Sequence, residues 1–269
     1  MADSGIDDSW DLIVTPWHVD EYIPAFPSPA TATEVACPDL PASPVAARMS
    51  LLHQAALGAV TRAARPLVLS GDCPTTRAVV AGLQRRHRDL VVLWLDAHGD
   101  FNTPAISTSG YLGGMALAML TGRTPDLFDD TLGLRPVPES KVVLADARDL
   151  DPAEHAALAA SDVRRVPADP DAITSALGRL GPVPVYVHLD IDVIDGTQLP
   201  GARFPSGPGP SLAQIEECLG AAAETATIAG AYFACAWLPE HADDRSSRDT
   251  MTRLTAPLGA ELTWHEPSR

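Results

Sequence analysis

The sequence predicts a doubly wound α/β domain that spans residues 1–269. Apolar runs of strand length alternate with helical windows along nearly the whole chain, no linker divides it, and several strands end in polar residues. The clearest strand is Leu90-Val91-Val92-Leu93-Trp94-Leu95, which is followed at once by Asp96-Ala97-His98-Gly99-Asp100. A continuous apolar run is typical of a strand that is buried on both faces of a parallel sheet.

The first half of the chain predicts these elements from local signals. Residues 11–15 are expected to form the first strand, and the proline-rich stretch up to about residue 44 is expected to be irregular or extended, because proline excludes regular helix. Apolar residues at helical spacing predict a helix over 45–63. The elements expected next are a strand at 66–69, a helix from about Pro74, the strand at 90–95, a loop at 101–109 and a helix at 113–120.

The second half of the chain continues the alternation. The expected elements are a strand at 141–145, a strand at 183–189, a Pro/Gly-rich loop at 200–210, a helix at 211–224, a strand at 228–237 and a helix at 248–258. Ser211 is expected to cap the helix that begins beside it.

The composition excludes some partners. There are 35 acidic side chains against 19 basic ones, a net charge of −16, which argues against nucleic acid and anionic membranes. An acidic pocket would attract a metal or a cationic substrate, although an acidic surface alone also accounts for the charge. No apolar run reaches the length of a membrane span, and residues 1–5 lack the features of a signal peptide. The four cysteines lack zinc-ribbon spacing, so a cytoplasmic protein is expected, and a homo-oligomer is allowed.

Polar side chains follow three of the predicted strands at their carboxyl ends. Asp96, His98 and Asp100 would project to one side, because alternate residues of an extended chain share a face, and Asp190 and Asp192 repeat this spacing. Ligands of α/β sheets bind beyond the carboxyl ends of the strands. So many carboxylates with an imidazole fit two divalent cations that share an activated water. A polar turn remains the alternative for each motif taken alone.

These motifs resemble those of the arginase, or ureohydrolase, family. That family has Gly-Gly-Asp-His, Asp-Ala-His-x-Asp and Asp-x-Asp-x-x-Asp, and here they stand as Ser70-Gly71-Asp72-Cys73, Asp96-Ala97-His98-Gly99-Asp100 and Asp190-Ile191-Asp192-Val193-Ile194-Asp195. The resemblance implies a three-layer α/β/α fold with a mostly parallel sheet, two Mn²⁺ per chain, and hydrolysis of a guanidine-like C–N bond.

The resemblance also implies roles for individual residues. One manganese would be held by Cys73, Asp96, Asp100 and Asp190, and the other by Asp96, His98, Asp190 and Asp192. Asp100 would also accept the proton of the attacking water. The α-carboxylate of an amino-acid substrate would meet Asn102 and Ser109, and its α-amino group would meet Asp149, Asp151 and Glu154. The segment 148–154 can equally be the start of a helix.

Three positions depart from the family pattern. Cys73 stands where the family has a histidine ligand, and it is either a thiolate ligand or a small buried residue. Gly113 stands where the family has a histidine that moves protons, and Ala236 stands at the position of the glutamate that binds the guanidinium group. Glu240 would replace that glutamate only if its loop were rearranged, and otherwise it is a surface acid.

These departures suggest a substrate less basic than arginine, because a carboxylate partner helps a strongly basic guanidinium most. The chain resembles the divergent branch of the family that hydrolyses Nω-hydroxy-L-arginine to hydroxyurea and L-ornithine in D-cycloserine biosynthesis. The alternatives are an ordinary arginase, another guanidino- or formimino-acid hydrolase, and an inactive metal-binding regulatory or scaffold protein.

Overall fold

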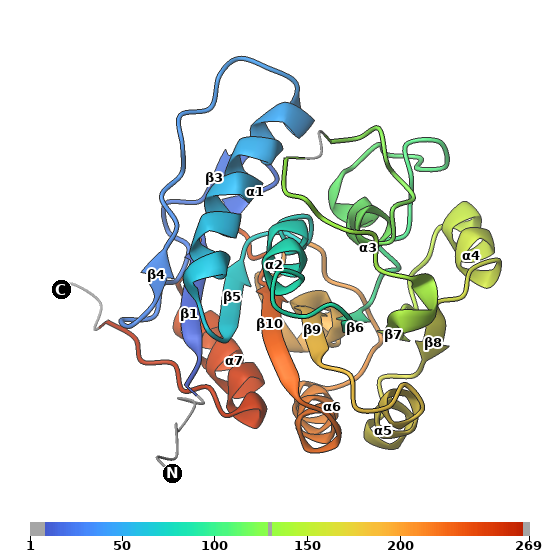
Figure 1. The fold of residues 1–269 in the computed structure, drawn as a ribbon. Coiled ribbons are helices and arrows are strands. Elements are labelled where there is room, and N and C mark those ends of the chain that lie inside the picture. Colours follow the sequence, from blue (N-terminus) through green and yellow to red (C-terminus); the bar gives the residue numbers. More distant parts are fainter. Residues whose placement is uncertain (1–8, 129–130, 266–269) are drawn as a thin grey trace, which may run out of the picture.

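The computed structural model describes residues 9–128 and 131–265, and within them eight strands form one central sheet (Figure 1). The order of the strands is β4-β1-β5-β10-β9-β6-β7-β8, and every neighbouring pair is parallel. This arrangement confirms the predicted parallel α/β fold. Residues 1–5, from which the lack of a signal peptide was predicted, lie outside the described residues.

Except for β4 and β8, the strands of the central sheet correspond closely to the apolar runs of the sequence. Those of the central sheet are β1 (Asp11–Thr15), β4 (Thr33–Glu34), β5 (Pro66–Ser70), β6 (Val91–Asp96), β7 (Val142–Asp146), β8 (Arg164–Val166), β9 (Val185–Asp190) and β10 (Ile228–Ala234). Every residue of β5, β6, β9 and β10 is buried, as a continuous apolar run requires. A separate antiparallel hairpin, β2 (Trp17–His18) with β3 (Glu21–Tyr22), lies in the proline-rich segment.

Helices cover both faces of the sheet and complete the three layers. They are α1 (Val45–Arg62), α2 (Thr76–Leu83), α3 (Ala116–Leu120), α4 (Pro152–Ala159), α5 (Pro170–Gly178), α6 (Leu212–Thr225) and α7 (Arg245–Thr255). Apolar side chains of α1 to α4 join one core cluster, and those of α5 to α7 join the cluster on the opposite face. None of the helices in the described ranges has the length and apolar character that crossing a bilayer requires.

The elements that were not predicted from the sequence include the short strands β2, β3 and β4, and also β8 and α5. β8 is an edge strand whose Arg164 and Arg165 are exposed, so it lacks an apolar run. α5 is short, and it begins at Pro170 behind Asp169, whose side chain accepts a hydrogen bond from the backbone N–H of Ala172. Its buried stripe is only Ile173, Ala176 and Leu177, too few apolar residues to stand out. Ser211 caps α6 as predicted, through a bond from the backbone N–H of Gln214.

The register places the carboxyl ends of five neighbouring strands at one edge. Ser70 at the end of β5 pairs with Ala234, and Ala234 pairs with Asp190 at the end of β9. Asp96 at the end of β6 pairs with Asp146 at the end of β7. From β6 the chain continues to β7 on one side, whereas from the neighbouring β9 it continues to β10 on the opposite side. The strand order therefore reverses between β9 and β6, and such a switch point opens a crevice for a ligand.

Candidate metal centre and substrate pocket

A pocket of about 310 Å³ opens at this edge of the sheet, and it is large enough for a small molecule. All the predicted site residues except Asp96 and Glu240 line it, namely Cys73, His98, Asp100, Asn102, Ser109, Asp149, Asp151, Glu154, Asp190 and Asp192. Asp96 is buried, and its carboxylate is within 3.5 Å of the His98 ring. The parallel strands therefore bring side chains that are more than a hundred residues apart in sequence into one hollow.

Asp96, His98 and Asp192 form one group of side chains that could hold a metal ion. Nδ1 of His98 lies 3.0 Å from Oδ2 of Asp192 and 3.5 Å from Oδ1 of Asp96. The Asp96 carboxylate accepts hydrogen bonds from the backbone N–H of His98 at 2.7 Å and from Nε1 of Trp94 at 3.0 Å. One potential ligand atom from each of Asp96, His98 and Asp192 lies within 4.8 Å of the other two. Such a group can surround one cation.

Cys73, Asp190 and Asp100 form a second set of polar side chains that line the same pocket. The Cys73 thiol donates to Oδ2 of Asp190 at 2.9 Å, while Oδ1 of Asp190 accepts the backbone N–H of Asp192 at 3.0 Å. Asp100 is buried with a left-handed backbone (φ 48°), and its Oδ2 has no hydrogen-bond partner among the described residues. A buried carboxylate oxygen without a partner is costly unless something else binds it.

Burial, with mutual repulsion as the second cause, raises the pKa values of several acids in this group. Burial, together with the nearby carboxylates, raises the pKa of Asp100 and of Asp190 well above the usual range. Burial and the charge of Asp96 raise the pKa of Asp192 to about 7. Although burial lowers the pKa of His98, Asp192 and Asp96 outweigh it and raise that pKa to about 12. Without another cation, a protonated imidazole and protonated carboxyls have to neutralise the site.

These residues fit divalent cations. Carboxylate oxygens suit hard ions, and imidazole and thiolate suit borderline ones, so the set offers donors for both kinds. A bound cation would give Oδ2 of Asp100 a partner, and its positive charge would lower the raised pKa values of Asp100 and Asp192.

The loops around the pocket carry the residues predicted to meet the amino-acid part of a substrate. Glu154, only 3 % exposed at the start of α4, accepts the backbone N–H of Phe101 at 2.8 Å, which ties this carboxylate to the loop after β6. Oδ1 of Asn102 is buried without a partner in the described chain. Asp149 accepts a hydrogen bond from the Ser206 hydroxyl at 3.2 Å, and Asp151 is exposed beside Thr108, whose hydroxyl lies 3.5 Å from its carboxylate.

Three aromatic rings form one wall of the pocket. The Tyr111 hydroxyl lies 2.9 Å from Nε2 of His18, whose Nδ1 lies 2.7 Å from the carbonyl oxygen of Gly71. The Tyr111 and His18 rings are stacked, and the Phe204 ring is 5.6 Å from that of Tyr111. No sequence signal pointed to His18, because it lies in the proline-rich segment.

Arg148 holds the loop after β9 in place. Its guanidinium group pairs with Asp146 and donates to the carbonyl oxygens of Val193 at 3.0 Å, Asp192 at 3.1 Å and Ser206 at 3.0 Å. Asp192 is one of the candidate metal ligands, so Arg148 fixes the backbone of this candidate ligand relative to Asp146 at the end of β7.

The profile of the Arginase family matches residues 20–262, which is most of the chain. The chain belongs to the arginase family. An N(omega)-hydroxy-L-arginine amidinohydrolase of Streptomyces lavendulae is 34 % identical over 151 residues, which cover 55 % of this chain and 52 % of that protein. An arginase of Neurospora crassa is 31 % identical over 173 residues, 57 % of this chain and 48 % of the relative. The chain thus spans about half the length of the curated relatives it matches.

The crystal structure of an arginase from Bacillus cereus has the same fold. It superposes with a TM-score of 0.74 at 26 % identity, over 85 % of this chain and 83 % of that one. The likeness agrees with the predicted three-layer arginase-like architecture.

The arginase-family positions at Gly113 and Ala236 are filled differently here. A Cβ atom added to Gly113 would lie 2.2 Å from Cε1 of Tyr111, so the tyrosine ring occupies the space that a larger side chain would need. Ala236 lines the pocket, as its alignment with the arginase-family glutamate predicts, whereas Glu240 is exposed and is not among the residues that line it. The loop after β10 does not bring Glu240 to the site, because its backbone is held by the Leu238 N–H to Gly201 bond at 2.8 Å.

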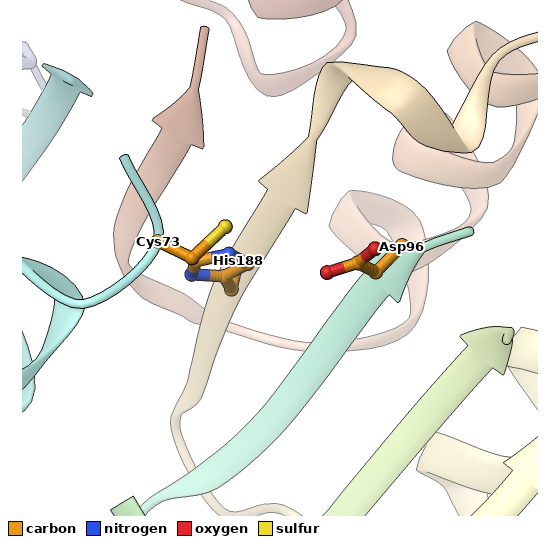
Figure 2. Close-up of side chains that lie close together, drawn as sticks. All are labelled: Cys73, Asp96 and His188. Carbon is orange, nitrogen blue, oxygen red and sulfur yellow. The ribbon is translucent and has the colours of Figure 1, made fainter. Parts of the chain in front are cut away.

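Sequence reasoning missed His188, a fully buried histidine on β9. A ring nitrogen of His188, Sγ of Cys73 and a carboxylate oxygen of Asp96 lie within 4.8 Å of one another (Figure 2). The signal was available, because His188 precedes Asp190 by two residues in a strand and therefore shares its face.

Proposed function

We propose that the protein is a dimanganese amidinohydrolase that cleaves the guanidino C–N bond of an arginine-type amino acid. The favoured substrate is Nω-hydroxy-L-arginine, and the products are hydroxyurea and L-ornithine. The observation that carries the proposal is the convergence of Cys73, His98, Asp100, Asp190 and Asp192 on one pocket, with Asp96 buried beside them. Membership of the arginase family, and the similarity to a hydroxyarginine amidinohydrolase, support the reaction class.

Two groups of side chains that could hold a metal ion, Cys73, Asp96 and His188 and then Asp96, His98 and Asp192, overlap with the expected ligand sets. Cys73, Asp96, Asp100 and Asp190 would hold one manganese, and Asp96, His98, Asp190 and Asp192 the other. When bound, such ions lower the pKa of water and stabilise developing negative charge. Asp100 is suited to accept the proton of the attacking water, because its Oδ2 is buried, unpartnered in the described chain and on the pocket wall.

Tyr111 takes the place of the imidazole that Gly113 cannot supply. If His18 donates its Nδ1 proton to the Gly71 carbonyl, its Nε2 accepts the Tyr111 O–H, and the tyrosine oxygen keeps lone pairs for a donor in the pocket. We assign this oxygen to the hydroxyguanidine group of the substrate. A neutral partner, with Ala236 in place of a carboxylate, suits a group less basic than guanidine.

The rim of the pocket would bind the amino-acid end of the substrate. Asn102 and Ser109 line the pocket, and the Asn102 side-chain amide and the Ser109 hydroxyl would donate hydrogen bonds to the α-carboxylate. Asp149, Asp151 and Glu154 supply the negative charge that an α-ammonium group requires. A small-molecule amino acid is therefore the expected partner. The four free cysteines, all within the described residues, suit the reducing cytoplasm proposed for it.

The test measures the metal content and the hydrolysis of Nω-hydroxy-L-arginine and L-arginine, on the wild type and on Cys73→His. Two manganese ions per chain and faster turnover of hydroxyarginine are expected for the wild type. Cys73→His is expected to raise arginine turnover, because imidazole donates less electron density to the metal than thiolate does and leaves it a stronger Lewis acid. Cys218→Ser, a buried cysteine of α6 outside the pocket, is the matched control.

Other results would select the alternatives. Equal or faster hydrolysis of arginine would indicate an ordinary arginase, and turnover of only formimino or other guanidino acids would indicate a sister activity. Two bound metals with no turnover of any of these compounds would support an inactive metal-binding protein.

A further inference from the structure

His188 is held rigidly below the floor of the pocket. Its ring lies parallel to Trp94, with centroids 3.4 Å apart and planes at 5°, and its other face meets Tyr232 at 5.1 Å. The His188 side chain is fully buried, and the Trp94 and Tyr232 rings on its two faces fix the orientation of the imidazole. Such a side chain offers its nitrogen atoms in fixed directions.

One nitrogen of His188 is paired and the other is not. Nδ1 lies 3.2 Å from the hydroxyl of Thr76, which is itself hydrogen-bonded to the Tyr186 hydroxyl. Nε2 is buried and finds no hydrogen-bond partner in the described part of the chain. Histidines that bind metals characteristically donate the N–H of the second ring nitrogen to a fixed acceptor, which leaves the first with a free lone pair. The Thr76–Tyr186 pair can provide that acceptor.

The position of His188 suits a ligand of the cation that Cys73 would hold, which we call the inner cation; the outer cation is the one that His98 would hold. Figure 2 shows the Asp96 carboxylate, at the end of β6, pointing toward Cys73 in the loop after β5 and His188 on β9. Their ligand atoms lie within 4.8 Å of one another. Donors on opposite sides of one ion, each at about 2.1–2.3 Å, are about 4.4 Å apart, so small adjustments close the three around one cation.

We propose that His188, through Nε2, is a ligand of the inner cation together with Cys73 and Asp96, an addition to the set that the arginase-family motifs predict. The inference rests on the proposed function only in requiring that the pocket binds divalent metal. His188 would supply, from strand β9, the imidazole that is missing at position 73. A thiolate with an imidazole is a softer donor set than carboxylates alone, so the inner position favours Co²⁺ or Zn²⁺ over Mn²⁺ more strongly than the outer one does.

The test uses Co²⁺ bound to the full-length protein and counts the ligands by X-ray absorption fine structure, in which imidazole rings give a distinct outer-shell signal. His98→Asn removes the one histidine assigned to the outer position, so an imidazole signal that remains must come from elsewhere. With one equivalent of Co²⁺, this variant is expected to show one sulfur and one imidazole per metal, and a thiolate-to-cobalt absorption band.

Adding His188→Gln to that variant is expected to remove the imidazole signal and weaken Co²⁺ binding by at least about tenfold, the lower end of the loss for an outer-shell partner. His53→Gln is the matched control, because His53 is also fully buried with an unpartnered Nε2 among the described residues but lies in α1. It is expected to leave the ligand count unchanged. The count in His98→Asn does not depend on whether the His188 variant folds.

Two outcomes overturn the assignment in different ways. If the wild type binds two metals and hydrolyses its substrate, while His98→Asn gives sulfur without imidazole, His188 is not a ligand and the proposed function stands. A hydrogen bond from His188 to the Cys73 sulfur would give that spectrum. If the wild type binds no divalent metal, the proposed function and the assignment of His188 are both wrong.

Discussion

Replacing Tyr111 by phenylalanine tests how the site compensates for Gly113. The substitution removes the hydroxyl that lies 2.9 Å from Nε2 of His18 and keeps the ring that stacks on it. The ring also continues to fill the space over Gly113, which a Cβ atom there would meet at 2.2 Å. The substitution therefore removes one oxygen atom and leaves the shape of the pocket unchanged.

The expected magnitude follows from two lost hydrogen bonds. His18 is 7 % exposed, so losing the bond to its Nε2 should lower the free energy of unfolding by about 1 kcal/mol. In a chain of this size that corresponds to a fall in Tm of about 2–4 °C. Losing a bond to the hydroxyguanidine group, worth about 1.5 kcal/mol when one partner is charged, should reduce kcat/KM for hydroxyarginine about tenfold.

The assay measures kcat/KM for Nω-hydroxy-L-arginine and L-arginine on the wild type, Tyr111→Phe and Tyr22→Phe. Tyr22 is 44 % exposed and outside the pocket lining, so it controls for removal of a tyrosine hydroxyl elsewhere. Arginine lacks the N-hydroxyl group and should be affected by less than about twofold, within the energy of a weak contact. The preference for hydroxyarginine should thus fall in Tyr111→Phe alone.

An unchanged preference in a Tyr111→Phe protein that retains its metal would refute the reasoning. So would an equal loss for both substrates, because the hydroxyl would then act on a group that the two compounds share.

Three further outcomes are expected. Arg148→Met should lower the free energy of unfolding by about 3 kcal/mol in urea titrations, because it leaves the half-buried Asp146 without its partner and three backbone carbonyls without their donor; a loss below about 1 kcal/mol would contradict this. Without metal, the folded protein should lose stability as the pH rises from about 4 to 8, because the raised pKa values of Asp192 (about 7) and His98 (about 12) make the folded state bind more protons than the unfolded chain. Thermal melts in chelator should show this slope, and saturating Mn²⁺ should flatten it; equal Tm at both ends of the range would count against it. Ser211→Ala should lower stability by about 1 kcal/mol through loss of the α6 cap while kcat/KM stays constant, and a change in kcat/KM would show that α6 also controls the site.

Local sequence patterns determined the positions of the candidate metal ligands. The apolar run before Asp96 is long enough to be a buried strand, and an extended chain would project His98 and Asp100 to the same side as Asp96. In the structure β6 ends at Asp96 and Asp100 has a left-handed backbone (φ 48°), so the turn after the strand, not continued alternation, brings His98 and Asp100 to the pocket. Parallel strands then place their carboxyl ends at one edge, which is why Asp190 and Asp192 could be expected near them. These inferences needed only the periodicity of the chain and the polarity of each strand end.

The tertiary structure alone decided which side chains fill the gaps in the motifs. Tyr111 lies over Gly113 because a loop folds back against His18 from a distant hairpin, and no local periodicity encodes that contact. Glu240 stays exposed because its loop is bonded to Gly201 rather than directed into the pocket. His188 shares a strand with Asp190, but its approach to Cys73 depends on the neighbouring positions of β5, β9 and β6. Side chains on regular elements follow from the sequence, whereas contacts between loops depend on packing across the whole sheet.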